Sequence, residues 1–139
     1  MTVQPTGESS SAVAAAVMHI GDVAARTELS IRSLRHWDDV GLIRPSGRTD
    51  GGFRLYTPAD VEKIMTIRRM KPLGFTLEQM SVAMRDIETL HDRNAQSRHA
   101  AARERLTALL SEAATRREKL ERQLEMADEF LDRLHAQLG

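Results

Sequence analysis

A seven-residue repeat in the last third of the chain strongly limits what the sequence can fold into. Ten positions recur at alternating spacings of four and three residues, and all but one carry Leu or Ala. No proline follows His91 and glycine returns only at Gly139, so the spacing predicts one continuous helix with an apolar stripe. The stripe consists of Leu106, Leu110, Ala113, Arg117, Leu120, Leu124, Ala127, Leu131, Leu134 and Leu138.

This stripe needs a partner helix. A helix of roughly 40 residues is about 60 Å long, and the remainder of a 139-residue chain is too small to cover it. A second copy of the chain is the default partner, because most soluble oligomers are twofold homodimers. Arg117 interrupts the stripe and is interpreted as a residue that sets register, with ligand binding as the alternative. The stripe alone leaves the orientation of the two helices open.

Residues 20–40 have the pattern of two short helices joined by a tight turn at Thr27-Glu28. Ser30 can cap the second helix by accepting hydrogen bonds from backbone N–H groups of its first turn. Apolar residues give the first segment one apolar side: Ile20, Val23, Ala24 and Leu29. Residues spaced by three are expected to face the core from the second helix: Ile31, Leu34, Trp37 and Val40. Its polar face suits phosphates and base edges in a major groove, and carries Arg32, Ser33, Arg35 and His36.

A β-hairpin is predicted next, because Asp50-Gly51 followed by Gly52 favours a tight turn and residues 53–56 alternate as a strand does. Arg48, Arg54 and Tyr56 are the candidates for contacts with a sugar-phosphate backbone. The alternative is a solvated hairpin that only packs Phe53.

Two further helix starts have specific signals. Thr57-Pro58-Ala59-Asp60 combines a capping hydroxyl, proline at the first helical position and a carboxylate near the positive end of the helix dipole. Gly74 ends that helix, and Thr76 with Gln79 forms a capping box for the next. Between them lies a basic corner, in which Arg69 and Lys71 are further candidates for backbone contacts and a solvated surface is the alternative.

These motifs, in this order, resemble the MerR family of bacterial transcription regulators over about residues 20–87. The matching pieces are SLRHWD at 33–38, Gly41-Leu42, RTDGGFRLY at 48–56 and LGFTLE at 73–78. Family members usually have two tyrosines where this chain has His36 and Trp37, and Tyr where it has Phe53, so those phenolic hydroxyls are missing. The resemblance implies an antiparallel coiled-coil homodimer that binds double-stranded DNA at an inverted-repeat operator. It also implies distortion of promoter DNA, which acts on RNA polymerase indirectly.

Composition excludes several other classes of protein. The formal net charge is zero and there is no cysteine, so thiolate metal ligation is excluded. His91 and His99 could share a helix face, but two exposed histidines are more often solvated, and we expect no metal and no cofactor. Ser, His and Asp residues do not single out a nucleophile and its base, so no catalytic residue and no enzymatic activity are predicted. No segment approaches the ~20 apolar residues that span a bilayer, and a cytoplasmic location is expected.

The sequence therefore predicts a mainly α protein with three parts. These are a disordered tail at 1–17, a winged helix-turn-helix DNA-binding domain with a small β-hairpin wing at 18–88, and a long C-terminal coiled-coil helix at 89–139. The expected function is sequence-specific transcription regulation by a homodimer that bends or untwists promoter DNA. The alternatives are an architectural, excisionase-like DNA-bending accessory protein and a coiled-coil protein-interaction scaffold.

Overall fold

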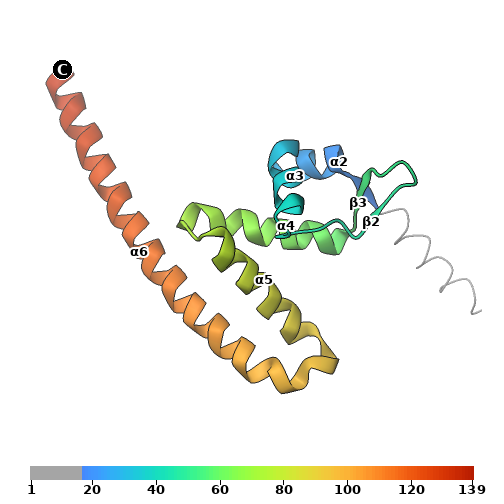
Figure 1. Cartoon of the computed structure of the whole chain (residues 1–139). Helices are drawn as coiled ribbons and strands as arrows, with labels where there is room; N and C mark the ends of the chain where they lie inside the picture. The colour runs from blue at the N-terminus through green and yellow to red at the C-terminus, as the bar shows by residue number, and fades with distance from the viewer. Residues whose placement is uncertain (1–16) are drawn as a thin grey trace, which may run out of the picture. The chain divides into compact units, whose positions relative to one another are not determined.

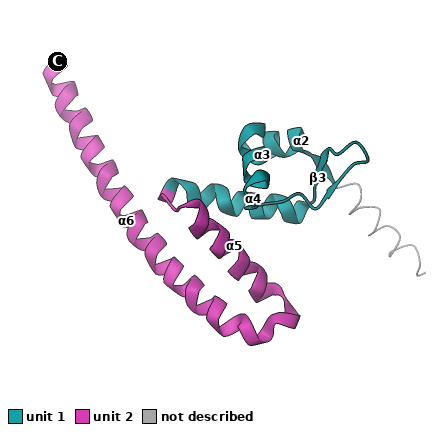
Figure 2. Cartoon of the chain, viewed as in Figure 1, with its two compact units in different colours: residues 1–72 teal, residues 73–139 magenta. Residues whose placement is uncertain are grey.

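The computed structural model describes residues 17–139, so the predicted tail lies outside the described residues except for Val17. Figure 1 shows the elements, and Figure 2 shows two compact units that divide between Pro72 and Leu73. The predicted mainly α fold with a small wing is confirmed. Among the described residues, no helix combines the length and the apolar character that crossing a membrane requires.

The described part of the first unit, residues 17–72, combines three α-helices with a small antiparallel sheet. Its elements are β1 (Met18–His19), α2 (Ile20–Thr27), α3 (Ile31–Asp39), β2 (Gly47–Arg48), β3 (Arg54–Tyr56) and α4 (Pro58–Met70). The strand order is β1-β3-β2, with Met18 opposite Tyr56 and Arg48 opposite Arg54. Strand β1 was not predicted, since two residues are too few for a periodic signal. The sheet ties Met18 and His19, just before α2, to the wing.

Local side-chain caps begin α3 and α4 as the sequence predicted. The Ser30 hydroxyl accepts from the backbone N–H of Ser33 over 3.0 Å, which starts α3. Thr57 and Asp60 cap α4 reciprocally, over 3.2 Å and 3.0 Å. Asp60 is buried and also accepts from the backbone N–H of Ser46 over 3.0 Å, so the cap of α4 fixes the loop before the wing.

The core of the first unit corrects part of the predicted helix pattern. Leu34 and Trp37 are buried as expected, but Ile31 and Val40 are exposed. Ile31 is the first residue of α3 and Val40 follows its last, so both lie where this short helix leaves the packed layer. The buried side chains that centre this core are Val23, Leu34, Trp37, Tyr56, Ile64 and Ile67.

The second unit is a helical hairpin. Helix α5 (Leu77–His91) is joined to α6 (His99–Leu138) by the 3-10 segment η2 (Arg93–Arg98), and a short turn η1 (Lys71–Leu73) spans the division between the units. The Thr76–Gln79 capping box is confirmed, with hydrogen bonds of 2.8 Å and 3.1 Å. The long helix begins at His99 instead of the predicted 89, because Ala95 has a non-helical conformation and lies buried within η2.

Helix α6 has two different halves. In its first half Ala102 is buried and Leu106, Ala113 and Arg116 are half-buried in the hairpin with α5. The predicted stripe is therefore partly covered within the chain at Leu106 and Ala113. Every residue from Arg117 to Gly139 is exposed, and we call residues 117–139 the exposed segment.

Candidate nucleic-acid interface

Helix α3 presents a polar face, and the buried Leu34 and Trp37 fix which way this face points. Arg32, Arg35 and His36 are exposed. Ser33 is half-buried, and its hydroxyl lies 3.0 Å from that of Ser30, so this side chain belongs to the helix cap. A shallow hollow on this face is lined by Ile31, Arg32, Arg35, His36 and Asp39.

The end of α3 is held by a turn whose geometry requires glycine. Gly41 has a φ of +76°, and the backbone N–H groups of Leu42 and Ile43 donate to the Trp37 carbonyl over 2.9 Å and 3.3 Å. A Cβ at Gly41 would also lie 3.2 Å from the Arg44 guanidinium. This turn fixes the C-terminal end of the helix that carries the polar face.

The wing is a short hairpin whose tip is solvent-exposed. Its turn is closed by bonds from the Thr49 N–H to the Phe53 carbonyl, 2.9 Å, and from the Gly52 N–H to the Thr49 carbonyl, 2.8 Å. The predicted hairpin is confirmed, although of its two glycines only Gly52 has a positive φ, +85°. Phe53 is exposed, so it is not packed as the alternative of a solvated hairpin expected.

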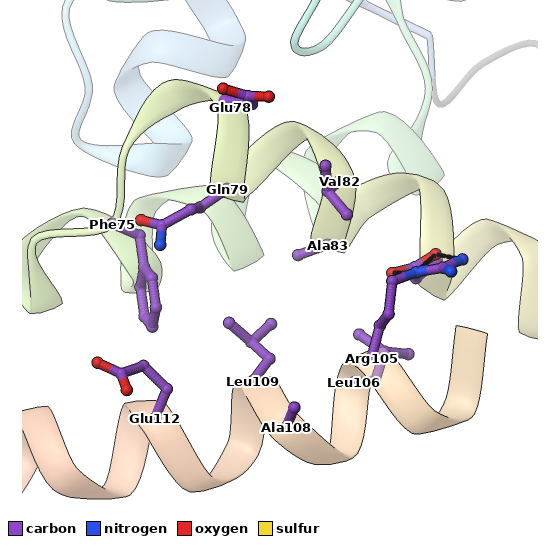
Figure 3. Close-up of a pocket in the computed structure, with 11 residues that line it drawn as sticks. Phe75, Glu78, Gln79, Val82, Ala83, Arg105, Leu106, Ala108, Leu109 and Glu112 are labelled. Atoms are coloured by element: carbon purple, nitrogen blue, oxygen red, sulfur yellow. Dashed lines mark hydrogen bonds and ion pairs between the residues drawn. The ribbon is translucent and has the colours of Figure 1, made fainter. Parts of the chain in front are cut away.

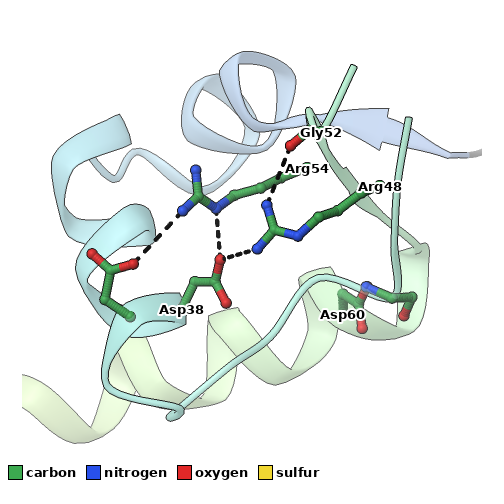
Figure 4. A network of polar contacts seen from close by, with 7 residues as sticks. Asp38, Arg48, Gly52, Arg54 and Asp60 are labelled. Atoms are coloured by element: carbon green, nitrogen blue, oxygen red, sulfur yellow. Dashed lines mark hydrogen bonds and ion pairs between the residues drawn. The ribbon is translucent and has the colours of Figure 1, made fainter. Parts of the chain in front are cut away.

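Both arginines of the wing bind one carboxylate on α3, as Figure 4 shows. Arg54 Nε and Arg48 donate to the same Asp38 oxygen over 2.6 Å and 2.8 Å. Arg48 also donates to the Gly52 carbonyl at 3.4 Å, and Arg54 lies 3.7 Å from Asp39. The Asp38 side chain is only 4% exposed, whereas Arg54 is 21% and Arg48 45% exposed. Sequence reasoning identified the arginines but missed Asp38, because a carboxylate on a polar helix carries no signal of its own.

The charges of this cluster stabilise one another. Burial raises the pKa of the Asp38 carboxyl, but the hydrogen bonds and charges of Arg54 and Arg48 outweigh burial, and the pKa lies below its usual value. The hydrogen bond to Asp38 likewise raises the pKa of Arg54. Asp38 therefore stays ionised at neutral pH and holds both cations against α3.

Tyr56 was predicted to contact a sugar-phosphate backbone from an outer face of the wing, and this prediction is wrong. Arg54 and Tyr56 share one side of β3, as alternation requires, but that side faces into the unit. The Tyr56 ring is buried, burial raises the pKa of its hydroxyl, and no described residue hydrogen-bonds to that oxygen. The structure thus places Tyr56 in the core.

The basic corner after α4 lies beside α3. The Lys71 ammonium stands 5.7 Å from the centre of the Trp37 ring, a distance at which cation–π attraction operates. Arg69 and Lys71 are both exposed, while Arg68 lies 3.7 Å from Glu28. The two predicted contact residues of this corner are therefore accessible on the unit that carries α3 and the wing.

The second unit holds a groove that the sequence did not reveal. It has a volume of about 490 Å³ between α5 and α6, and Figure 3 shows Phe75, Val82 and Leu109 among its apolar lining. At one end Arg105 donates to both oxygens of the buried Asp86, with a shortest distance of 2.7 Å. Within residues 17–139 no cluster of three or more His, Asp or Glu side chains could hold a metal ion.

Comparisons with known proteins agree with this geometry. Residues 18–87 match the family model described as MerR HTH family regulatory protein. The nodulation protein NolA of Bradyrhizobium elkanii is 38% identical over 73 residues, which are 52% of this chain and 33% of NolA. The regulator CueR of Yersinia pestis is 37% identical over 62 residues, 45% of each chain. The chain thus spans less than half the length of these relatives.

Solved structures show the same fold. A MerR family regulator from Bacillus thuringiensis aligns with a TM-score of 0.66 at 17% identity, covering 84% of this chain and 98% of that one. HiNmlR, a MerR family regulator lacking the sensor domain and bound to promoter DNA, aligns with a TM-score of 0.57 at 21% identity, covering 88% and 87%. With its helix pair, wing and matched residues 18–87, this chain belongs to the MerR family of helix-turn-helix regulatory proteins.

Proposed function

We propose that the chain is a sequence-specific DNA-binding transcription regulator that acts as a homodimer and bends or untwists promoter DNA. The observation that carries this proposal is the exposed basic face of α3 beside a wing that is fixed to the same helix. We assign DNA binding to residues 18–88 and dimerisation to residues 89–139. The structure of HiNmlR on promoter DNA supports the same role for this fold.

The accessible cations divide into two groups by position. Arg32, Arg35 and His36 project from α3, the element that enters a major groove in helix-turn-helix proteins. Arg48 in the wing and Arg69 and Lys71 in the basic corner flank that helix, where they would meet phosphates. In this proposal α3 reads base edges, and the flanking cations place it on the duplex.

The exposed segment supports a homodimer. It leaves Leu124, Phe130 and Leu138 largely in solvent, which a partner helix would cover. The stripe of residues 106–138 reads the same spacing in both directions, so two copies can align antiparallel with Leu120 opposite the partner's Leu124. Arg117 then lies opposite a small Ala127. A parallel alignment would instead place Arg117 against its own copy, which like charges disfavour.

A rigid dimer implies distortion of DNA. The antiparallel connector fixes the distance and twist between two α3 helices, so straight DNA that does not match must bend or untwist, at a cost of a few kcal/mol. Two symmetric heads require an inverted-repeat operator. Distortion of an over-long promoter spacer would then let RNA polymerase engage both promoter elements, without direct contact with this protein.

The test begins with selection of bound sequences from the source genome. A regulator yields inverted repeats, affinity that falls steeply with salt, bent DNA in circular-permutation gel shifts, and transcription that changes when one or two spacer base pairs are deleted. Bent DNA with transcription indifferent to the protein would identify an architectural factor instead. Binding that salt does not weaken would leave only the protein-interaction scaffold.

A further inference from the structure

The contact between Asp38 and the two wing arginines joins α3 to the wing through one oxygen atom. Both hydrogen bonds end on Oδ2 of Asp38, a side chain with 4% exposure. Asp38 follows Arg35 and His36 on α3, whereas the arginines flank the wing turn, so one carboxylate links the elements expected to meet bases and phosphates. Asp38 itself is too buried to touch DNA.

We propose that Asp38 is a positioning residue that determines DNA specificity by fixing the wing to α3. This inference rests on the proposed function. A wing free of α3 could place its arginines on phosphates of any duplex, because phosphate contacts carry no sequence information. A wing held by Asp38 reaches its phosphates only where α3 also fits the bases. Asp38 therefore makes a sequence-independent contact conditional on the sequence-dependent one.

The geometry also assigns different roles to the two arginines. Arg54 is 21% exposed, donates through Nε to Asp38 and lies beside Asp39, so it serves as the inner link. Arg48 is 45% exposed and binds Asp38 through one terminal nitrogen. Arg48 is the wing cation that meets a phosphate, and Arg54 is the one that holds the wing.

Charge gives a readout that a purely structural role would not produce. Asp38 neutralises one of the two wing cations, so non-specific DNA meets one unbalanced charge. Asp38→Asn keeps the shape of the side chain but releases the second cation, which can then neutralise a further phosphate. The salt slope for non-specific binding should become steeper by about 0.9, while the ratio of specific to non-specific affinity should fall about tenfold, the effect of losing one well-placed contact.

The experiment compares Asp38→Asn with Asp39→Asn on two duplexes. One carries the sequence that the wild-type chain selects from a random pool, and the other is an unrelated duplex of equal length. Asp39→Asn makes the same charge change one residue away, but its side chain is 69% exposed and 3.7 Å from Arg54. The specificity ratio should fall much further for Asp38→Asn. An equal or greater fall for Asp39→Asn would overturn the inference.

A second pair of variants keeps the test decisive if Asp38→Asn does not fold, which circular dichroism would reveal. Either variant leaves a single arginine paired with Asp38, so the non-specific salt slope should become shallower by about 0.9 in both. The specificity ratio should fall for Arg54→Gln, the inner link, and stay nearly unchanged for Arg48→Gln, because a phosphate contact carries no sequence information. An equal or greater fall in the specificity ratio for Arg48→Gln would overturn the assignment. A wild-type chain that selects no sequence would overturn the proposed function and this inference with it. If the wild-type chain selects a sequence but the variants keep the wild-type ratio of specific to non-specific affinity, this inference is overturned and the proposed function stands.

Discussion

Charge at the centre of the exposed segment should separate the proposed dimer into monomers. Leu120 and Leu124 are 42% and 63% exposed. In the proposed antiparallel alignment, Leu120 of each copy contacts Leu124 of the other, close to the twofold axis. Burying a whole leucine gives about 1.5–3 kcal/mol, so covering roughly the exposed half of each gives about 1 kcal/mol. Four leucines per dimer then contribute about 4 kcal/mol, which corresponds to about a thousandfold in the dissociation constant.

The double substitution Leu120→Asp with Leu124→Asp removes this contribution and places four carboxylates around the axis, which weakens the dimer further. Sedimentation equilibrium over a range of concentrations measures the effect, and operator affinity should fall with it. Arg122→Gln with Arg133→Gln is the matched control, because it makes the same change in net charge away from the stripe. An unchanged mass for the leucine variant at micromolar concentration would refute the proposed interface.

Three further outcomes are expected. Arg35→Ala should narrow the gap between selected and unrelated DNA by about 1–3 kcal/mol, measured by titration of both duplexes; equal weakening on both would contradict base reading. Arg117→Leu should keep or raise the unfolding temperature while allowing other registers, because a polar stripe residue gives specificity at a cost in stability; sedimentation would show mixed species. The pKa of Asp38 is lowered by folding, so its stabilisation is present above about pH 4 and is lost as acid protonates it; Asp38→Asn should flatten that part of the stability–pH curve.

Helix starts could be predicted from the sequence because they depend on neighbouring residues only. Ser30 and the pairs Thr57–Asp60 and Thr76–Gln79 cap their own helices, and spacing within three residues contains all the needed information. The exposed basic face of α3 followed for the same reason, since helical period alone separates Arg35 from Leu34.

Long-range contacts determined what could not be predicted. Alternation showed that Arg54 and Tyr56 share a side of the strand, but only the packing of the sheet shows that this side faces inward. The role of Asp38 depends on an arginine sixteen positions later in the chain. Likewise, the heptad spacing of α6 shows that Leu106 and Ala113 lie on an apolar stripe. It does not show that these two residues pack against α5 of the same chain.

The hairpin of the second unit holds α6 only in its first half, so a small tilt there would displace the far end of the helix much further. Two contacts clamp the helix near its base: Arg105 on Asp86, and Arg116, which donates to the Leu73 carbonyl over 3.1 Å and covers the Phe75 ring at 4.1 Å. Beyond them the helix continues for about 33 Å to Leu138 at the standard rise. A tilt of about 5° at the clamp would move that tip sideways by about 3 Å, for a segment of this length. A small change at the Arg116 clamp would thereby become a larger sideways displacement of the end of α6, where we propose that a second copy packs.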